Sequence, residues 1–255
     1  MSYEIKKAAV LGAGVMGATI AAHLTNAGIE CGLLDIIPPQ LTDDDKKKGL
    51  TEKSPEWRNR FANNGLAGVL KAKPAGFYTK KNAVMVKTGN FADNMGWLRD
   101  VDWVIEVVIE NLKIKQELFA NVVKNVKPTC IISTNTSGIP IGNITANLSA
   151  GVKERFLGTH FFNPPRYMKL LEIIPGAETK KEVISYMVEF CERVLGKGVV
   201  ICKDVPNFIG NRIGVFDISN AINLMLKKNM TIPQLDAIVG KSLGRPGTAI
   251  AGTLD

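Results

Sequence analysis

The feature that most constrains the fold is a glycine-rich turn near the start of the chain, Gly12-Ala13-Gly14-Val15-Met16-Gly17. An apolar run over residues 8–11 predicts a buried strand before the turn, and residues 15–27 predict a helix after it. At this spacing, Gly12 is expected to make the tight turn, Gly14 to let a phosphate approach the backbone, and Gly17 to let helix and strand pack closely. The helix that begins at Val15 and Met16 would then offer its N-terminus to an anion.

A carboxylate follows the turn at the distance that a dinucleotide site requires. Asp35 closes a second apolar run, residues 29–34, so residues 8–35 predict a βαβ unit of the Rossmann type. A carboxylate here would accept a hydrogen bond from the ribose 2′-hydroxyl of NAD and repel a 2′-phosphate, and residues 36–38 supply no arginine for NADP. We therefore expect NAD. The alternative is a glycine-rich turn that binds nothing, which the full βαβ context disfavours.

The composition indicates a folded protein with a basic surface. The 255 residues are 45% apolar, which is enough to bury a large core. The net charge of +8 comes from 32 Lys and Arg against 24 Asp and Glu, and the basic residues are spread along the chain. Such a surface is either simply solvated or attracts a multiply anionic ligand such as a dinucleotide or coenzyme A. No nucleic-acid-binding module accompanies it, so nucleic acid is not an expected partner.

The cysteines and histidines favour neither a metal site nor a disulfide framework. The chain has two histidines and four cysteines without CxxC spacing, Cys31, Cys130, Cys191 and Cys202. Reduced thiols predict a cytoplasmic protein. Lys6 and Lys7 precede an apolar stretch much as the basic region of a signal peptide does. The glycines at Rossmann spacing and the shortness of the run instead predict folded protein without a membrane span.

Strand-like and helix-like segments alternate along the rest of the chain. Patterns of apolar residues predict strands at residues 83–87, 103–108, 131–132, 156–162, 170–174 and 198–202, and helices at residues 112–126 and 180–195. This alternation predicts an α/β fold with a doubly wound, mostly parallel sheet over residues 1–203. The polar region 38–81, with a helical piece at 56–70, is longer than an ordinary connection. It is either a solvated insert or an excursion over a coenzyme, with Lys71 or Lys73 at its phosphates.

The pattern changes to helices alone from residue 204 onward. An apolar helix is predicted at residues 208–227 and a second one from near Pro233, and the chain ends at Asp255 soon after Gly244-Arg245-Pro246-Gly247. An apolar helix needs partner helices to cover it. Residues 204–255 therefore predict the beginning of a truncated all-α domain that belongs to a longer protein.

Candidate cofactor-binding and catalytic groups lie in and after the later strands. Asn135, expected at the cofactor, and Ser137 follow the strand at residues 131–132, and the carboxyl ends of parallel strands line the ligand crevice of such sheets. A short turn joins the strands at 156–162 and 170–174, which allows His160 and Glu172 to face one another. A base, an orienting carboxylate and a hydroxyl donor beside a dinucleotide predict a dehydrogenase that acts on hydroxyl groups.

Six ordered motifs make the chain similar to the 3-hydroxyacyl-coenzyme A dehydrogenase family over nearly its whole length. They lie at residues 12–17, 106–117 (EVVIENLKIKQE), 133–137, 160–164, 169–174 and 203–212 (KDVPNFIGNR). The sequence around residues 38–39, 71–78, 137–140 and 206–208 most resembles the long microbial members, in which an enoyl-coenzyme A hydratase part follows the dehydrogenase.

The resemblance implies NAD-dependent oxidation of (S)-3-hydroxyacyl-coenzyme A to the 3-oxoacyl thioester in fatty-acid β-oxidation. Position by position, it makes His160 the general base and Glu172 the group that orients it, and it has Ser137 and Asn211 hydrogen-bond the reacting oxygen. The other matching positions, expected at the ribose or nicotinamide, are Glu110, Lys115 and Asn163. The expected partners are an acyl-coenzyme A substrate and a second copy of the chain, bound through the helical domain.

Two other kinds of protein share parts of this pattern. One is an NAD-binding or structural Rossmann protein that has lost catalysis, which the intact set of Ser137, His160, Glu172 and Asn211 disfavours. The other is a hydroxy-acid dehydrogenase related to the hydroxyisobutyrate enzymes, which would be expected to use a lysine base. The His-x-x-Asn-Pro arrangement at residues 160–164 disfavours it.

Overall fold

The computed structural model describes residues 3–240 and residue 243. The chain divides into two compact units, Met1–Pro206 and Asn207–Asp255, which are described separately. The predicted boundary between residues 203 and 204 falls close to this division.

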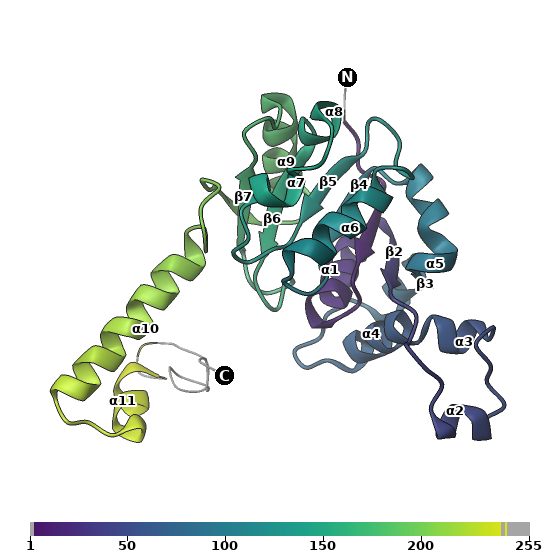
Figure 1. The fold of residues 1–255 in the computed structure, drawn as a ribbon. Coiled ribbons are helices and arrows are strands. Elements are labelled where there is room, and N and C mark those ends of the chain that lie inside the picture. The colour runs from purple at the N-terminus through teal and green to yellow at the C-terminus, as the bar shows by residue number, and fades with distance from the viewer. Residues whose placement is uncertain (1–2, 241–242, 244–255) are drawn as a thin grey trace. The chain divides into compact units, whose positions relative to one another are not determined.

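A single sheet forms the centre of the first unit, and its eight strands run in the order β3-β2-β1-β4-β5-β6-β7-β8 (Figure 1). The strands are β1 Lys7–Leu11, β2 Glu30–Asp35, β3 Val86–Asn90, β4 Trp103–Glu106, β5 Ile131–Thr134, β6 Phe156–Phe161, β7 Leu170–Pro175 and β8 Gly198–Ile201. Neighbouring strands are parallel except β6 and β7, which are antiparallel. The predicted mostly parallel α/β sheet is confirmed, and the carboxyl ends of β1, β4, β5 and β6 meet at one edge.

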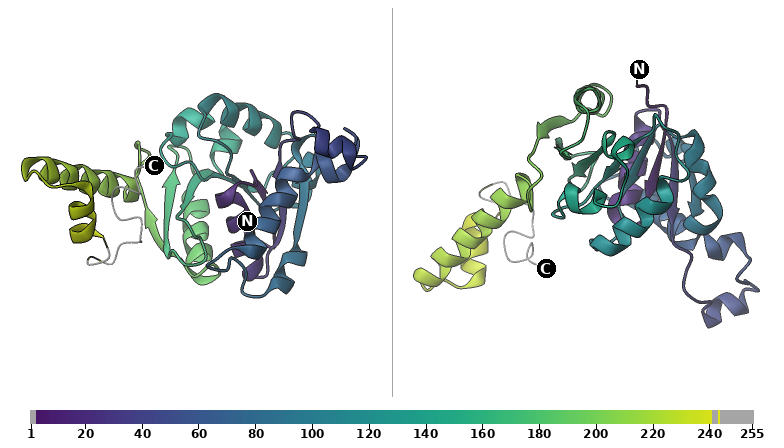
Figure 2. Two further views of the ribbon diagram at one scale, coloured as in Figure 1. Left: turned by 90° about the horizontal axis from the view of Figure 1, so that it is seen from below. Right: turned by 45° about the horizontal axis from the view of Figure 1, so that its top comes forward.

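Helices cover both faces of this sheet (Figure 2). Those of the first unit are α1 Val15–Asn26, α2 Asp43–Lys47, α3 Pro55–Arg58, α4 Arg60–Lys71, α5 Phe91–Asn94, α6 Leu112–Val122, α7 Ile141–Thr145, α8 Ala150–Lys153 and α9 Lys181–Arg193, with the 3-10 helices η1 Lys80–Met85 and η2 Met95–Asp100. One buried cluster joins alternate strand residues such as Val10 to Ile20 of α1 and Met187 of α9. Across the sheet, Phe119 of α6 packs edge-on against Phe156 of β6, with ring centroids 4.8 Å apart.

Two elements differ from the sequence-based prediction. The strand expected at residues 83–87 is mostly the 3-10 helix η1, because Thr79 caps it by accepting a hydrogen bond from the Lys81 amide and pairing with β2 begins only at Val86. The helical piece at 56–70 is broken into α3 and α4, since the backbone at Asn59 leaves helical geometry with φ −97° and ψ 12°. The insert nevertheless packs on the core through α4, which contacts α1.

The second unit contains the helices α10, Gly210–Lys227, and α11, Ile232–Val239. The side chains of Ala221 and Leu235 are buried between them. Thr231 begins α11 with a capping box, in which its hydroxyl accepts from the Gln234 amide. Within the described residues, no helix is long and apolar enough to cross a membrane.

Candidate active site

The glycine-rich turn has the geometry that its sequence predicts. Gly12 lies in the left-handed region at φ +109°, its amide donates to the Leu34 carbonyl at 2.7 Å, and a Cβ atom there would lie 2.5 Å from the Val107 carbonyl oxygen. A Cβ atom on Gly17 would meet the Gly12 carbonyl oxygen at 1.8 Å. The tight turn and the close packing of helix on strand are therefore both confirmed, and neither position accepts a side chain.

The N-terminus of α1 is open toward solvent. Gly14 is the N-cap, no side chain caps the helix, no acidic residue lies in its first turn, and nothing lies within 4 Å of a Cβ atom built on Gly14. Val15 and Met16 begin the helix, and the Val15 side chain is 71% exposed. Uncapped amides and the helix dipole at such an end attract an anion. The turn therefore fits the pyrophosphate of a dinucleotide.

Asp35 lies at the end of β2 beside this turn. Its Oδ2 accepts from the Ala13 amide at 2.6 Å and its Oδ1 from the Ile36 amide at 2.7 Å. Each carboxylate oxygen has a second lone pair for a ribose hydroxyl. Asp35 also lines a cavity of about 760 Å³ with walls that include Phe91, Met95 and Val108. A mostly apolar cavity with two carboxylates in its lining, those of Asp35 and Glu117, fits an adenosine group.

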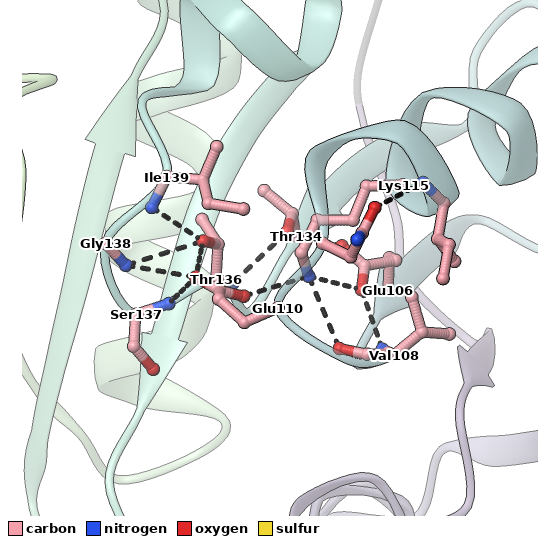
Figure 3. A network of polar contacts seen from close by, with 11 residues as sticks. Glu106, Val108, Glu110, Lys115, Thr134, Thr136, Ser137, Gly138 and Ile139 are labelled. Carbon is pink, nitrogen blue, oxygen red and sulfur yellow. Dashed lines mark hydrogen bonds and ion pairs between the residues drawn. The ribbon is translucent and has the colours of Figure 1, made fainter.

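A buried ion pair lies where β4 ends, at the start of the polar network in Figure 3. The Lys115 Nζ atom contacts Glu106 Oε1 at 2.7 Å and Glu110 Oε2 at 3.2 Å, and it donates to the Val108 carbonyl at 3.4 Å. The side chains of Lys115 and Glu106 are 1% and 0% exposed. Burial raises the pKa of the Glu106 carboxyl, against the opposing effect of the Lys115 ammonium. The three acceptors occupy all three protons of Lys115.

Glu110 connects this ion pair to the loop that follows β5. Its Oε1 accepts from the Thr136 hydroxyl, from the Ser137 amide at 3.0 Å and from the Gly138 amide at 3.2 Å (Figure 3). Burial favours the neutral form of this carboxyl, but the hydrogen bond from Thr136 and the charge of Lys115 together hold its pKa below the usual value. The loops after β4 and β5 are thereby joined, and Ser137 stands exposed beside them.

His160 and Glu172 are direct partners across β6 and β7. They are paired in the antiparallel register, and His160 Nδ1 lies 2.7 Å from Glu172 Oε2. Both side chains are buried, and the imidazole lies beside the Phe162 ring with centroids 4.6 Å apart. The predicted facing of the two residues is confirmed. The two residues come together because a short turn reverses the chain after β6, so that β7 runs antiparallel beside it.

The remaining predicted residues occupy different environments. Asn135 is buried, and its Oδ1 accepts from the Phe161 amide at 2.9 Å, which ties the end of β5 to the end of β6. Asn163 is exposed in the turn after β6. Asn211 lies in α10 and so belongs to the second unit, so its role remains a prediction.

Glu106, which anchors the network, was not among the site residues predicted from the sequence. Its carboxylate also accepts from the Thr134 hydroxyl at 2.6 Å and from the Val108 amide at 2.7 Å. The available signal was a glutamate inside the apolar run of β4. Lys115, nine positions later on the following helix, is its partner of opposite charge. A charged residue in a strand that is otherwise buried needs a partner of opposite charge.

Together, the turn, Asp35 and the paired His160 and Glu172 define an NAD-binding domain of the dehydrogenase class. The chain belongs to the 3-hydroxyacyl-CoA dehydrogenase family, because the family model described as "3-hydroxyacyl-CoA dehydrogenase, NAD binding domain" matches residues 7–205. NAD is accordingly the cofactor of this domain.

Related proteins agree with this assignment. A probable 3-hydroxyacyl-CoA dehydrogenase of Bacillus subtilis is 48% identical over 100% of this chain, which spans 32% of that protein. A protein of the same description from Deinococcus radiodurans is 46% identical over 99% of this chain and 69% of its own length. The crystal structure of (S)-3-hydroxybutyryl-CoA dehydrogenase from Ralstonia eutropha matches with a TM-score of 0.71 at 26% identity, over 95% of this chain and 79% of that one.

Proposed function

We propose that the protein oxidises (S)-3-hydroxyacyl-coenzyme A to 3-oxoacyl-coenzyme A with NAD, in the β-oxidation of fatty acids. The observation that carries this proposal is the buried contact of 2.7 Å between His160 Nδ1 and Glu172 Oε2. The relatives, two probable 3-hydroxyacyl-CoA dehydrogenases and an (S)-3-hydroxybutyryl-CoA dehydrogenase, support the choice of substrate class. The alternative, an NAD-binding protein without catalytic activity, would not require a buried histidine–carboxylate pair at this edge of the sheet.

In the proposed reaction, His160 removes the proton of the 3-hydroxyl group. The Nδ1–H group donates to Glu172, and this tautomer leaves the lone pair on Nε2, where the substrate proton is taken up. Bound NAD would accept the hydride from C3. The Glu172 carboxylate, itself buried, stabilises the imidazolium that forms and fixes the plane of the ring. Ser137 and Asn211 would donate hydrogen bonds to the reacting oxygen.

The network in Figure 3 would place the loops on either side of the nicotinamide ribose. Glu110 holds the backbone of the loop that carries Ser137, so it would act both on the cofactor and on the position of Ser137. The Lys115 side chain is 1% exposed, and its ammonium already has three protein acceptors. We therefore propose that Lys115 acts indirectly, by holding these loops, and does not contact the cofactor. Asn163, exposed in the turn after β6, would reach the nicotinamide side.

The coenzyme A part of the substrate would lie over the insert. A cavity of about 650 Å³ lies between α1 and α4, with Gly14, Thr19 and Gly68 among the residues that line it. Lys71 and Lys73 are exposed at the end of α4, where the coenzyme's phosphates could be met by positive charge. A homodimer formed through the helical domain and a cytoplasmic location remain part of this proposal.

The experiment is a comparison of turnover and NAD binding for His160→Gln in the natural polypeptide that carries this chain. General-base catalysis contributes about 10²-fold or more, so turnover should fall by that factor while the Kd for NAD stays nearly unchanged. A variant that keeps most of its turnover would overturn the role of His160.

A further inference from the structure

The turn that joins the two catalytic strands is held by a residue outside the motifs. Residues 162–169 connect β6, which carries His160, to β7, which carries Glu172, and they include Asn163. Any movement of this turn is transmitted to the ends of both strands. What fixes the turn therefore bears on the geometry of the catalytic pair.

Lys197 reaches this turn from the segment between α9 and β8. Its side chain is buried, with a relative exposure of 7% for the residue. The Nζ atom donates to the Pro165 carbonyl and, at 3.0 Å, to the Met168 carbonyl, and it lies 5.6 Å from the centre of the Phe161 ring. One ammonium group thus holds both halves of the turn and touches the strand of His160.

No carboxylate lies within ion-pair distance of Lys197 in the part of the chain that the structure describes. The titratable groups that interact electrostatically with it are Cys191 of α9 and His23 of α1, and Arg166 of the turn acts on the same histidine. None of these supplies a negative charge near neutral pH, because burial raises the pKa of the Cys191 thiol. A buried ammonium without a counter-ion is costly, and carbonyl oxygens alone compensate it. An apolar side chain would fill this space at lower cost but would leave the turn unheld.

A second cation fastens the same turn on its outer side. Arg166 donates to the carbonyls of Ala75 at 2.8 Å and Phe77 at 2.7 Å, and its guanidinium lies 4.4 Å from the centre of the Tyr78 ring. The turn is therefore tied to the insert by Arg166 and to the core by Lys197.

We propose that Lys197 is a positioning residue, whose buried ammonium holds the turn and so sets the His160–Glu172 pair in its working geometry. The inference rests on the proposed function, since it assigns the pair its catalytic role. Lys197 touches neither substrate nor cofactor in this account. Its effect passes through the carbonyls of Pro165 and Met168.

The charge of Lys197 gives the proposal a pH dependence. Burial lowers the pKa of Lys197 to about 8. Burial raises the pKa of the neighbouring Cys191 thiol, and burial together with the charge of Lys197 lowers the pKa of His23 to about 4. Above pH 8 the neutral amine loses its charge-assisted hydrogen bonds to the turn, and catalysis should weaken. An arginine at this position would not lose its charge in that range.

The experiment compares Lys197→Met, Lys197→Arg and the exposed control Lys181→Met in the natural polypeptide. Displacement of catalytic groups by about 1 Å can cost about 10²-fold, so we expect kcat of Lys197→Met to fall by about tenfold or more with the Kd for NAD within about threefold of wild type. Lys197→Arg should recover most of kcat and move the alkaline loss of activity to higher pH. Lys181→Met should match wild type in every measurement.

NMR of the imidazole rings gives a readout that does not depend on turnover. The ring signals that are present in wild type and absent from a His160→Gln variant belong to His160. These signals should shift in Lys197→Met and return toward wild type in Lys197→Arg. Unmoved His160 signals together with kcat within about twofold of wild type in Lys197→Met would overturn the proposal. If Lys197→Met does not fold, an alkaline limb of Lys197→Arg identical to that of wild type would overturn it instead. Lack of turnover in wild type would refute the proposed function, while the ring signals would still test the positioning.

Discussion

The buried ion pair beneath the cofactor loops makes a demanding prediction for Lys115→Met. The variant keeps an unbranched side chain of similar length but removes the ammonium that lies 2.7 Å from Glu106 and 3.2 Å from Glu110. Glu106, whose side chain is 0% exposed, then keeps only the hydroxyl of Thr134 and the amide of Val108 as partners. Removal of one partner from a buried pair costs about 3–5 kcal/mol, because the other charge is left uncompensated.

The loss should be measured by thermal and urea unfolding of wild type and variant. For a protein of this size, about 1 kcal/mol corresponds to about 2–4 °C, so Tm should fall by about 6–20 °C. Without the ammonium, the raised pKa of Glu106 rises further. The folded state then binds a proton that the unfolded state has released, so the stability of the variant should fall as pH rises above the unfolded value of about 4.3. The deficit should be smaller at pH 5 than at pH 8.

Two matched variants control for the change of shape. Lys113→Met, on the same helix but exposed, should lie within about 0.5 kcal/mol of wild type. The double variant with Glu106→Gln removes the orphaned charge and should recover at least half of the loss. A cost below about 1 kcal/mol for Lys115→Met, or a double variant less stable than Lys115→Met alone, would refute the reasoning.

Three further predictions follow from the same geometry. Glu172→Gln should lower kcat by about tenfold or more with little change in NAD affinity, because the amide cannot stabilise an imidazolium on His160. Steady-state kinetics and NAD titration measure the two quantities, and equal losses of kcat and of NAD affinity would contradict the prediction. Asp35→Ala should weaken NAD binding more than NADP binding in a fluorescence titration, and equal losses would reject the role of Asp35. Burial is the main cause that lowers the pKa of His23 from 6.5 to about 4. As pH falls from 6.5 to 4, the unfolded state therefore takes up a proton that the folded state does not, and wild type should lose about 3 kcal/mol of stability. Urea unfolding of His23→Leu across that range should show a flatter pH dependence, and an unchanged slope would count against the assignment.

Local patterns were sufficient to predict most of the sheet. The turn at Gly12 and Gly17 is specified by steric demands that only glycine meets, and the pairing of His160 with Glu172 follows from two strands joined by a short turn. The strand expected at residues 83–87 was wrong because apolar residues over so short a stretch fit a 3-10 helix equally well, and only the pairing with β2 decides where β3 begins.

Long-range electrostatic contacts were not predictable in the same way. Lys197 looks like a solvated charge in the sequence. Glu106 stands in an apolar run, but its partner Lys115 lies on another element, so the burial of both Glu106 and Lys197 depends on how separate elements pack. Lys197 follows a glycine turn at Gly196, where an exposed lysine would be ordinary. The place of Lys115 was predicted at the cofactor, whereas the structure puts its ammonium on two carboxylates of the protein.

The activity to be tested is the transfer of a hydride from a 3-hydroxyacyl thioester to NAD by the natural polypeptide. The most direct measurement is the initial rate of NADH formation from (S)-3-hydroxybutyryl-coenzyme A, run beside the (R) enantiomer and beside NADP. We expect rapid NADH formation with the (S) substrate, far slower reaction with the (R) substrate, and little reduction of NADP. No NADH formation from the (S) substrate by a folded, NAD-binding protein would contradict this expectation.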